Sequence, residues 1–178
     1  MLPFNKQVIN VKQKILLYLY LIIVLIALIA MIVSSVNYAE MYRAISNFRV
    51  IVKDFYYNID FVNKILQIDM NITLIHNSSF SGFTTHSLIF SLYYNNVSEP
   101  LAEGTIWLEK KPLAPYSNIT ENREVKINTQ TEQVAEEFVN SYQQGEDISW
   151  TFSSIVRVFV FESDFPIDIN PPPFSFSK

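Results

Sequence analysis

The chain of 178 residues has no cysteine and only three glycines. Without cysteine it has neither a disulfide framework nor a thiol nucleophile, so any folded domain must be held together by its core. Three scattered glycines cannot form a glycine-rich phosphate-binding loop. The two histidines, His76 and His86, are fewer than a metal site usually needs, and we interpret them as ordinary strand-end residues. We therefore expect no catalytic residue, metal or cofactor, and a protein that is not an enzyme.

Two acidic pairs remain as candidates for chemistry. Glu136 and Glu137 fall on a predicted helix, where a solvated helix face is a simpler explanation than an acid/base pair. Asp164 and Asp168 flank the last predicted strand, and surface solvation is a simpler explanation there than a calcium site. Neither pair changes the expectation of a non-catalytic protein.

Acidic residues are absent from the first 36 positions, which carry Lys6, Lys12 and Lys14 and a charge of +3. Residues 37–178 carry 10 basic and 17 acidic residues and a charge of −7, and the two parts sum to the net −4. The acidic balance of the second part argues against nucleic-acid binding, which calls for a basic patch. It argues equally against docking of that part on anionic lipid headgroups.

Charge of either sign is absent from the run between Ile15 and Val36, ILLYLYLIIVLIALIAMIVSSV. As a helix it is about 33 Å long at about 1.5 Å per residue, enough to cross a hydrocarbon core about 30 Å thick. A helix also satisfies every backbone hydrogen bond within the span. We therefore predict a transmembrane helix at 15–36, in contact with the lipid bilayer. The alternative is a buried helix of a soluble protein.

The three lysines precede this run, whereas Glu40 and Arg43 nearly balance each other behind it. Because basic residues stay on the cytoplasmic side, we expect a cytoplasmic N-terminus at 1–14 and an extracytoplasmic C-terminal domain. The chain would then be a single-pass protein of the plasma membrane. A cleaved signal peptide is the main alternative, but the run is longer than a typical signal's apolar region and no clear small-x-small site follows it.

Four N-x-S/T sequons lie beyond the run, at Asn71, Asn77, Asn96 and Asn118. Each sequon alone is weak evidence, since such triplets arise by chance in asparagine-rich chains. Together they agree with an outer domain, and they are the candidate N-glycosylation sites of this protein.

Residues 37–48 show helical rather than alternating periodicity, because Tyr38, Met41, Tyr42 and Ile45 recur at intervals of three and four. This spacing predicts that the membrane helix continues outward over 37–48. A linker with incidental aromatic residues is the alternative. Tyr38 and Tyr42 are suited to the headgroup region, where amphipathic rings are enriched.

From residue 49 onward the pattern is typical of strands. The clearest case is ILQIDMNITLI, where apolar and polar residues alternate from Ile65 to Ile75 and predict a strand with one buried face. Asn95-Asn96 marks a turn, and two prolines make 110–116 a loop or sheet edge. The predicted strands are 49–59, 65–75, 86–94, 101–108, 124–128, 148–161 and 165–169. About seven strands with short connections predict a mainly β protein, an antiparallel β-sandwich at 49–170 behind a single transmembrane α-helix.

One short helix is expected within this domain, near 131–144. Val134, Phe138 and Tyr142 recur every four residues, Thr131 is a plausible N-cap, and Gly145 is a stop signal. The Pro-rich tail at 171–178 is extended, without a strand partner of its own. It either hangs free or lies along a neighbouring subunit.

Aromatic residues suggest where a partner binds. The candidate interface residues are Tyr38, Tyr42, Phe55, Tyr56, Tyr57 and Phe61. Packing within the domain is the simpler explanation for the last four, and a surface for a partner protein is the more specific one, since aromatic residues are enriched at interfaces. Trp107 and Trp150 lie in predicted strands and are expected in the core.

Four segments resemble the late embryogenesis abundant group-two domain, also called the water-stress and hypersensitive-response domain. A strand ends in Ile75-His76-Asn77-Ser78-Ser79, where the family usually has Asn-Pro-Asn or Asn-Pro-Ser, and HSLIFSLYYNN is similar to its alternating segment with a Tyr-rich turn. EKKPLAPYSNITENREVKIN resembles its proline-containing loop before a strand, and ISWTFSSIVRVFVFESDFPIDI its closing hairpin. The sequence departs from the family at Ser78, in place of proline, and at Ser153-Ser154, where a glycine often stands.

The resemblance covers most of 49–170 and implies a largely non-enzymatic family, many of whose members have one N-terminal membrane helix. Our leading hypothesis is a non-catalytic accessory or structural subunit of a membrane or cell-envelope assembly, which binds membrane or envelope proteins through its sandwich. A lipid or hydrophobic-ligand binding module is a second hypothesis and needs an apolar cavity of about 300–1,000 Å³. A pilin-like filament subunit is a third, although no convincing cleavage signal lies near Lys14.

Overall fold

The computed structural model describes the backbone of residues 4–110, 112–160, 162–171 and 174–175, and side chains from residue 13 to residue 171 within these ranges. The chain divides into two compact units, Met1–Tyr42 and Arg43–Lys178, which are described separately. The predictions for Lys6 and Lys12, for Phe161 at the end of a strand, and for most of the tail concern side chains outside the described set.

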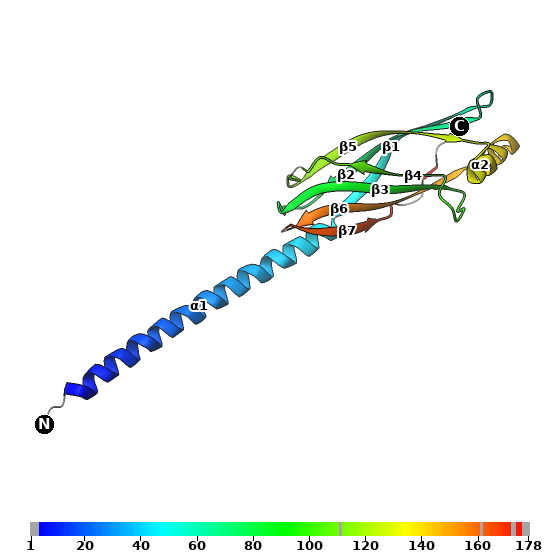
Figure 1. Ribbon diagram of the computed structural model, residues 1–178. Coiled ribbons are helices and arrows are strands. Elements are labelled where there is room, and N and C mark those ends of the chain that lie inside the picture. The colour runs from blue at the N-terminus through cyan, green and yellow to red at the C-terminus, as the bar shows by residue number, and fades with distance from the viewer. Residues whose placement is uncertain (1–3, 111, 161, 172–173, 176–178) are drawn as a thin grey trace. The chain divides into compact units, whose positions relative to one another are not determined.

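Nearly all of the first unit is helical. Helix α1 (Phe4–Ser46) runs through the predicted span and continues over residues 37–46, as the blue and cyan ribbon in Figure 1 shows. Its segment Gln13–Ser46 reaches a mean hydropathy of 3.2 in its most apolar window, and none of that window is buried. It is the one helix in the described part of the chain that is long and apolar enough to cross a membrane.

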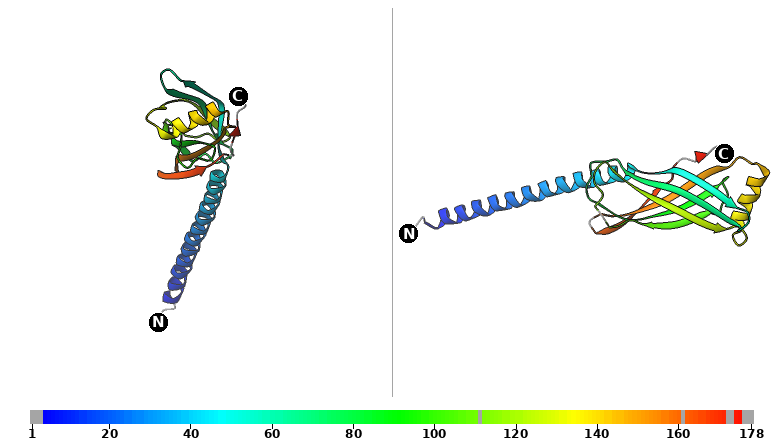
Figure 2. Two further views of the ribbon diagram at one scale, coloured as in Figure 1. Left: turned by 90° about the vertical axis from the view of Figure 1, so that its right-hand side faces the viewer. Right: turned by 90° about the horizontal axis from the view of Figure 1, so that it is seen from above.

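The second unit is a sandwich of two antiparallel sheets (Figures 1 and 2). The smaller sheet has the order β1-β2-β5 and contains β1 (Phe48–Asp60), β2 (Ile65–His76) and β5 (Ser117–Asn128). The larger has the order β4-β3-β6-β7 and contains β3 (Phe83–Tyr94), β4 (Ala102–Trp107), β6 (Ser149–Val160) and β7 (Ser163–Ile169). A mainly β, antiparallel sandwich with one short helix is thereby confirmed.

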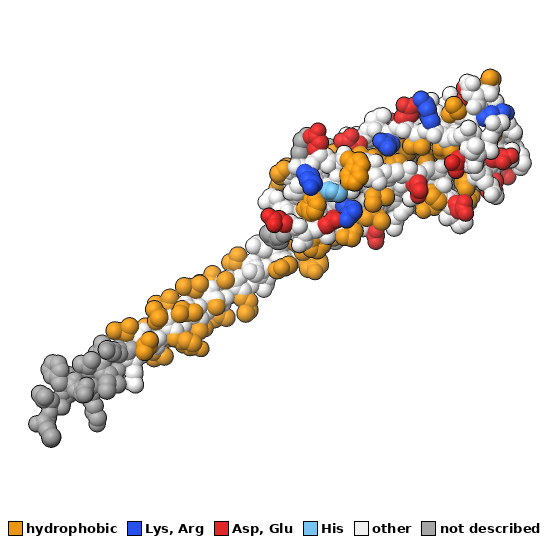
Figure 3. All heavy atoms as spheres, in the orientation of Figure 1, with side chains coloured by type: hydrophobic (Ala, Val, Ile, Leu, Met, Phe, Trp, Pro, Cys, Tyr) orange, Lys and Arg blue, Asp and Glu red, His pale blue; other side chains and the backbone are white. Residues whose placement is uncertain are grey.

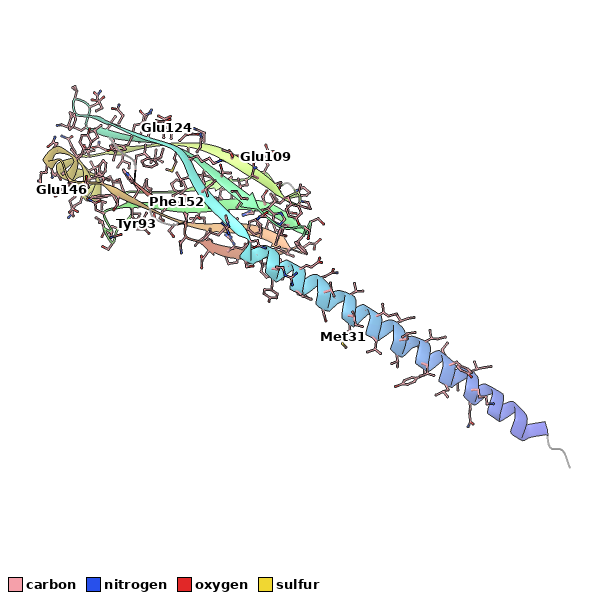
Figure 4. All side chains as sticks on the ribbon, turned by 180° about the vertical axis from the view of Figure 1, so that it is seen from behind. Met31, Tyr93, Glu109, Glu124, Glu146 and Phe152 are labelled. Atoms are coloured by element: carbon pink, nitrogen blue, oxygen red, sulfur yellow. The ribbon has the colours of Figure 1, made fainter. Side chains whose placement is uncertain are left out.

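The core lies between the sheets, and β2 contributes its alternating apolar face. The predicted inward residues of β2 are all at most 2% exposed: Leu66, Ile68, Met70, Ile72 and Leu74. From the other sheet Phe90 and Phe152 stack with ring centroids 5.9 Å apart, and Figure 4 labels Phe152 among the strands. Burying one such side chain stabilises a fold by about 1.5–3 kcal/mol, which is how a domain without disulfides holds together.

Helix α2 (Gln133–Gln144) lies across one end of the sandwich (Figure 2). It ends as predicted at Gly145, which has φ +77°, and the N–H groups of Gly145 and Glu146 donate to the carbonyls of Tyr142 and Ser141. This pattern is the Schellman motif, which favours glycine because a Cβ is strained at positive φ. The predicted N-cap was wrong: Glu132 holds that position, without a side-chain hydrogen bond, and Thr131 lies one residue too early.

Strand β5 and the tail also differ from the prediction. Strand β5 begins at Ser117, seven residues before the predicted start at Glu124. The prediction missed its first half because the inward-facing positions there carry charged residues, which break the apolar–polar alternation. The tail does have a strand partner in its own chain, since β8 (Phe174–Ser175) pairs with Ser149 and Trp150 of β6. The expectation of a tail without a partner is corrected at these two residues, and residues 172–173 and 176–178 lie outside the described set.

Candidate functional site

The six predicted interface residues do not form one surface. Tyr56 and Phe61 are exposed on the second unit, and Tyr38 and Tyr42 are exposed on α1. Phe55 is buried, as packing within the domain, the simpler of the two explanations, predicts, and it is therefore not available to a partner. The cause is a bulge in β1 between Lys53 and Tyr56, which the alternation of the sequence does not reveal.

Phe61 belongs to an apolar tip, which we define as Phe61 and Val62 in the turn between β1 and β2. Val62 is 89% exposed, the highest value among the exposed large hydrophobic side chains. Polar residues dominate turns, so two neighbouring apolar side chains at a turn are unusual. Only Phe61 of the two was predicted from the sequence, although the apolar pair in Asp60-Phe61-Val62-Asn63-Lys64 was a signal for Val62 as well.

The backbone of the tip is fixed by Asp60. Its Oδ1 accepts hydrogen bonds from the backbone N–H groups of Asn63 and Val62, each at 2.9 Å, and its Oδ2 accepts one from the Asn63 side-chain amide at 2.6 Å. The hydrogen bonds from Asn63, and to a lesser degree that from Val62, hold the pKa of the Asp60 carboxyl below its usual value. These hydrogen bonds to the Asp60 carboxylate hold the turn in one preferred geometry, in which Phe61 and Val62 are exposed.

A surface groove of about 460 Å³ lies between this tip and α2. It is lined largely by polar side chains from the β1–β2 turn, the segment before α2 and the helix itself: Asp60, Lys64, Thr129, Gln130, Glu136, Asn140 and Gln143, with Ile59, Phe61 and Val139. Thr129 connects two segments that line the groove, since its N–H and its hydroxyl both donate to the Lys64 carbonyl, at 2.9 and 3.1 Å. The apolar tip therefore stands beside a polar concavity, the combination of anchor and polar rim found at protein interfaces.

Beneath α2 lies an aromatic cluster of Phe55, Tyr57, Tyr94, Phe138, Tyr142 and Trp150. Phe138 is fully buried at its centre, with its ring centroid 5.6 Å from Tyr57, 5.2 Å from Tyr94 and 5.4 Å from Trp150. Burial, and then the neighbouring Tyr142, raises the pKa of the Tyr57 hydroxyl. Burial, and then the carboxylates of Glu137 and Glu146, raises the pKa of Tyr94. Tyr57, predicted at an interface, thus serves mainly to hold α2 on the sandwich.

The edge strands β4 and β5 flank an open seam of the sandwich. One groove of about 670 Å³ lies at its α2 end, between Glu99–Glu103 and Val125–Asn128, and a second of about 460 Å³ lies at the other end, beside Trp107 and Ile119. The inward-facing positions Glu121 and Arg123 of β5 are exposed here. Inward-pointing charges are a usual protection of a sheet edge against pairing with further strands.

Trp107 was predicted in the core, and that prediction was wrong, because it is 72% exposed. Trp150 is buried as predicted. Residues of one parity on a strand share a face, and Trp107 shares its parity with Glu103 and Thr105, whereas Ala102 and Ile106 are buried. Counting parity along β4 would have placed the indole outside.

The two histidines have different surroundings. His76 is fully buried, with its Nδ1 3.1 Å from the Ala114 carbonyl and its Nε2 3.2 Å from the Ser78 hydroxyl. His86 lies at a bulge in β3 and packs at 5.4 Å against Trp107 and at 5.1 Å against Phe159. No group of three or more His, Cys, Asp or Glu side chains with metal-binding geometry occurs among the residues that the structure describes.

The acidic pairs lie at the surface. Glu136 and Glu137 are exposed on α2, and the Gln133 amide donates to Glu137 at 2.9 Å. Asp164 and Asp168 are exposed on β7, where Asp164 pairs with Arg157 of β6.

The four sequons differ in exposure. Asn77, Asn96 and Asn118 are exposed, at a strand end, in a turn with φ +57°, and near the start of β5. Asn71 lies in the middle of β2, where its amide donates to Asp54 at 2.9 Å and its Oδ1 accepts from Asn122 at 3.0 Å. The side chain of Asn71 is therefore already engaged in the outer polar face of the small sheet.

Comparison with family models finds no match for this chain, and comparison with curated proteins finds none either. Solved structures do resemble it. A protein from Arabidopsis thaliana is 11% identical, with a TM-score of 0.50 over 70% of this chain and 78% of that one. A protein from Archaeoglobus fulgidus is 14% identical, with a TM-score of 0.42 over 72% and 97% of the two chains.

A third similar structure is that of a candidate late embryogenesis abundant protein, 14% identical with a TM-score of 0.46 over 83% of this chain and 84% of that one. At these identities the likeness concerns the fold alone. The β domain is thus similar in fold to the Arabidopsis protein, and a candidate late embryogenesis abundant protein is among the structures that it resembles.

Proposed function

We propose that this chain is a non-catalytic, membrane-anchored accessory subunit of a membrane or cell-envelope assembly, and a divergent member of the late embryogenesis abundant group-two family. The observation that carries the proposal is the fixed apolar tip of Phe61 and Val62, which the Asp60 hydrogen bonds hold in solvent. Burying each side chain in a partner would contribute about 1.5–3 kcal/mol. Preorganisation adds to this, because little loop entropy is lost on binding.

The anchor in this proposal is α1, with residues 15–36 in the bilayer and Tyr38 and Tyr42 at the headgroups. The support is the uncharged run and the exposure of its side chains. The three N-terminal lysines support a cytoplasmic N-terminus in the plasma membrane. The β domain then lies outside the cytoplasm, where Asn77, Asn96 and Asn118 are the exposed candidates for N-glycosylation.

Partner binding is tested with the double substitution Phe61→Ser and Val62→Ser in the full chain, purified from its own membranes in mild detergent. Losing both apolar anchors should reduce the co-purified partner, measured by quantitative mass spectrometry, by about tenfold or more, which corresponds to about 1.4 kcal/mol. Tyr116→Ser is the matched control, since Tyr116 is 70% exposed on a different loop. A wild-type protein that migrates alone, or a double variant that keeps its partner, would contradict the proposal.

Orientation is tested by cysteine labelling, for which the cysteine-free chain is well suited. Ser79→Cys, at an exposed position after β2, should react in intact cells with a membrane-impermeant maleimide. Asn5→Cys should react only after the membrane is permeabilised. The reverse pattern would place the β domain inside, and labelling of both sites in intact cells would show that the helix does not anchor the chain across a membrane.

The hydrophobic-ligand hypothesis has less support. The groove beside the apolar tip is lined largely by polar side chains, and the other two mix apolar with polar and charged side chains, whereas such a ligand needs a mainly apolar pocket. Between the sheets, Phe90, Phe152 and the apolar face of β2 are almost fully buried. No feature of the described residues favours a pilin-like subunit over a single anchored subunit.

A further inference from the structure

The groove beside Trp107 has a composition that the partner-binding proposal does not use. We define the Trp107 groove as the concavity of about 460 Å³ lined by Thr85, Trp107, Leu108, Glu109, Asn118, Ile119 and Glu121. It lies where the end of β4 meets the start of β5, and Figure 4 labels Glu109 at this part of the surface. An exposed aromatic ring, two carboxylates and an amide thus border one concave surface.

The indole of Trp107 is exposed and also held in place. His86 contacts it edge to face, with an interplanar angle of 87°, and Phe159 supports His86 in the same way at 82°. The Lys110 ammonium lies over the Phe159 ring, 5.3 Å from its centroid. Figure 3 shows a pale blue histidine group at the surface of the β domain, with orange hydrophobic and blue basic groups beside it. The supported indole therefore offers a rigid flat surface to a ligand.

The polar residues of the groove define the ligand's chemistry. Carboxylates accept hydrogen bonds and do not donate them, so Glu109 and Glu121 favour a ligand with several hydroxyl donors and disfavour an anion. The negative face of an indole attracts the slightly positive C–H edge of an aliphatic ring. A saccharide combines both properties, because one face of its ring carries C–H groups and its rim carries hydroxyls. A groove of this volume is at the small end of ligand pockets, which suits one or two sugar rings.

We propose that the Trp107 groove binds a saccharide, with a sugar ring stacked on the indole and hydroxyls donated to Glu121 and Glu109. The sequence offers an independent link to sugars, because Asn118 is both a lining residue of the groove and the asparagine of an exposed sequon. The saccharide therefore has two sources of the same chemistry: a glycan attached at Asn118, or a free or envelope-bound glycan. The proposal goes beyond partner binding at the Phe61–Val62 tip and uses none of its residues.

The chain contains two tryptophans, which gives a selective optical probe. Trp150→Phe leaves exposed Trp107 as the sole tryptophan, and Trp107→Phe leaves buried Trp150. Full chains in detergent micelles are titrated with chitobiose and with mannobiose. We expect at least one of the two to shift or quench the emission of the Trp150→Phe protein, with no change in the Trp107→Phe protein. Calorimetry on the wild type gives the affinity without altering the core.

Substitutions locate the site. Trp107→Ala and Glu121→Gln should each weaken binding by about tenfold or more, as expected for loss of a stacking surface or a charge-assisted hydrogen bond. Glu103→Gln is the matched control, because Glu103 is also an exposed glutamate of the seam but lines the other groove. Its affinity should stay within about twofold of the wild type.

Asn118→Gln separates the two sources. If an attached glycan occupies the groove, this substitution shifts the Trp107 emission of the glycosylated protein, and added saccharide binds only after the substitution. If the ligand is a free or envelope glycan, saccharide binds with and without Asn118→Gln. The proposal is overturned if neither saccharide gives an emission change or a heat of binding and if Asn118→Gln leaves the emission unchanged. Equal weakening by Glu103→Gln and Glu121→Gln would also overturn it. Loss of partner binding at the tip would not affect either result.

Discussion

Phe138→Ala is expected to lower the free energy of unfolding of the β domain by about 4 kcal/mol, within the range for truncating a buried phenylalanine. Phe138 is fully buried and is the side chain through which α2 meets Tyr57, Tyr94 and Trp150. The expected loss exceeds a usual surface effect because three edge-to-face or tilted ring contacts disappear together with the apolar burial. A domain with a stability of about 5–15 kcal/mol would lose a large fraction of it.

Urea unfolding of the full chain in detergent, followed by tryptophan fluorescence, measures this loss. Val139→Ala is the matched control on the same helix, since Val139 is only half-buried and should cost about 1 kcal/mol. Residues of α2 line two surface grooves, so the helix is held to the domain mainly by its buried face. Its amide protons should therefore exchange faster in Phe138→Ala than in the control. Equal destabilisation by the two variants would show that α2 is not held by the aromatic cluster.

His76→Ala is expected to be nearly as costly, at about 3 kcal/mol. The imidazole stacks on Phe48 at 5.1 Å and meets Phe83 edge to face at 5.3 Å. It also hydrogen-bonds the Ala114 carbonyl and the Ser78 hydroxyl. Truncation removes the ring from a fully buried site and breaks its hydrogen bonds to the Ala114 carbonyl and the Ser78 hydroxyl, so the loss of these bonds adds to the cost of the cavity.

The same unfolding measurement tests this prediction, with two controls. Ser78→Ala removes one of the hydrogen bonds to the ring and should cost about 1 kcal/mol. His86→Ala removes the half-buried histidine of β3 and should cost less than His76→Ala, because its ring lies at the surface. A His76→Ala protein as stable as the His86→Ala protein would mean that the ring does not connect β2 to the 110–116 loop.

In the proposed function, location and surface rather than chemistry are what this chain offers a partner. The apolar tip and the Trp107 groove belong to opposite ends of β5 by register, since Ser117 pairs with His76 and Asn128 pairs with Ile65. Two separate surfaces could therefore be occupied at once. Their residues do not overlap, so substitutions at one can be read without disturbing the other.

Local periodicity by itself determined much of the domain. In β2, alternation named all five inward residues, because a strand that is paired on both sides and buried on one face must alternate. Gly145 as the end of α2 was equally readable, since few residues other than glycine tolerate the φ of +77° that closes the helix. The uncharged run of 15–36 was evident from composition, because a helix that is long and apolar enough to cross a membrane needs about 20 consecutive apolar residues.

Only the tertiary structure decided which alternating positions are covered. Glu121 and Arg123 face inward on β5 but lie at the open seam and not in a core. Their charges interrupt the apolar–polar alternation, so the sequence does not reveal the full strand of 12 residues. Trp107 lies outside the sandwich because the odd-numbered residues at the end of β4 face solvent. Phe55 lies inside because the bulge in β1 reverses which residues face the core. Burial depends on how separate strands pair and stack, and that information is spread over residues far apart in the chain. The long apolar helix was therefore readable from sequence, whereas the tip and the groove became visible only once the sandwich was assembled.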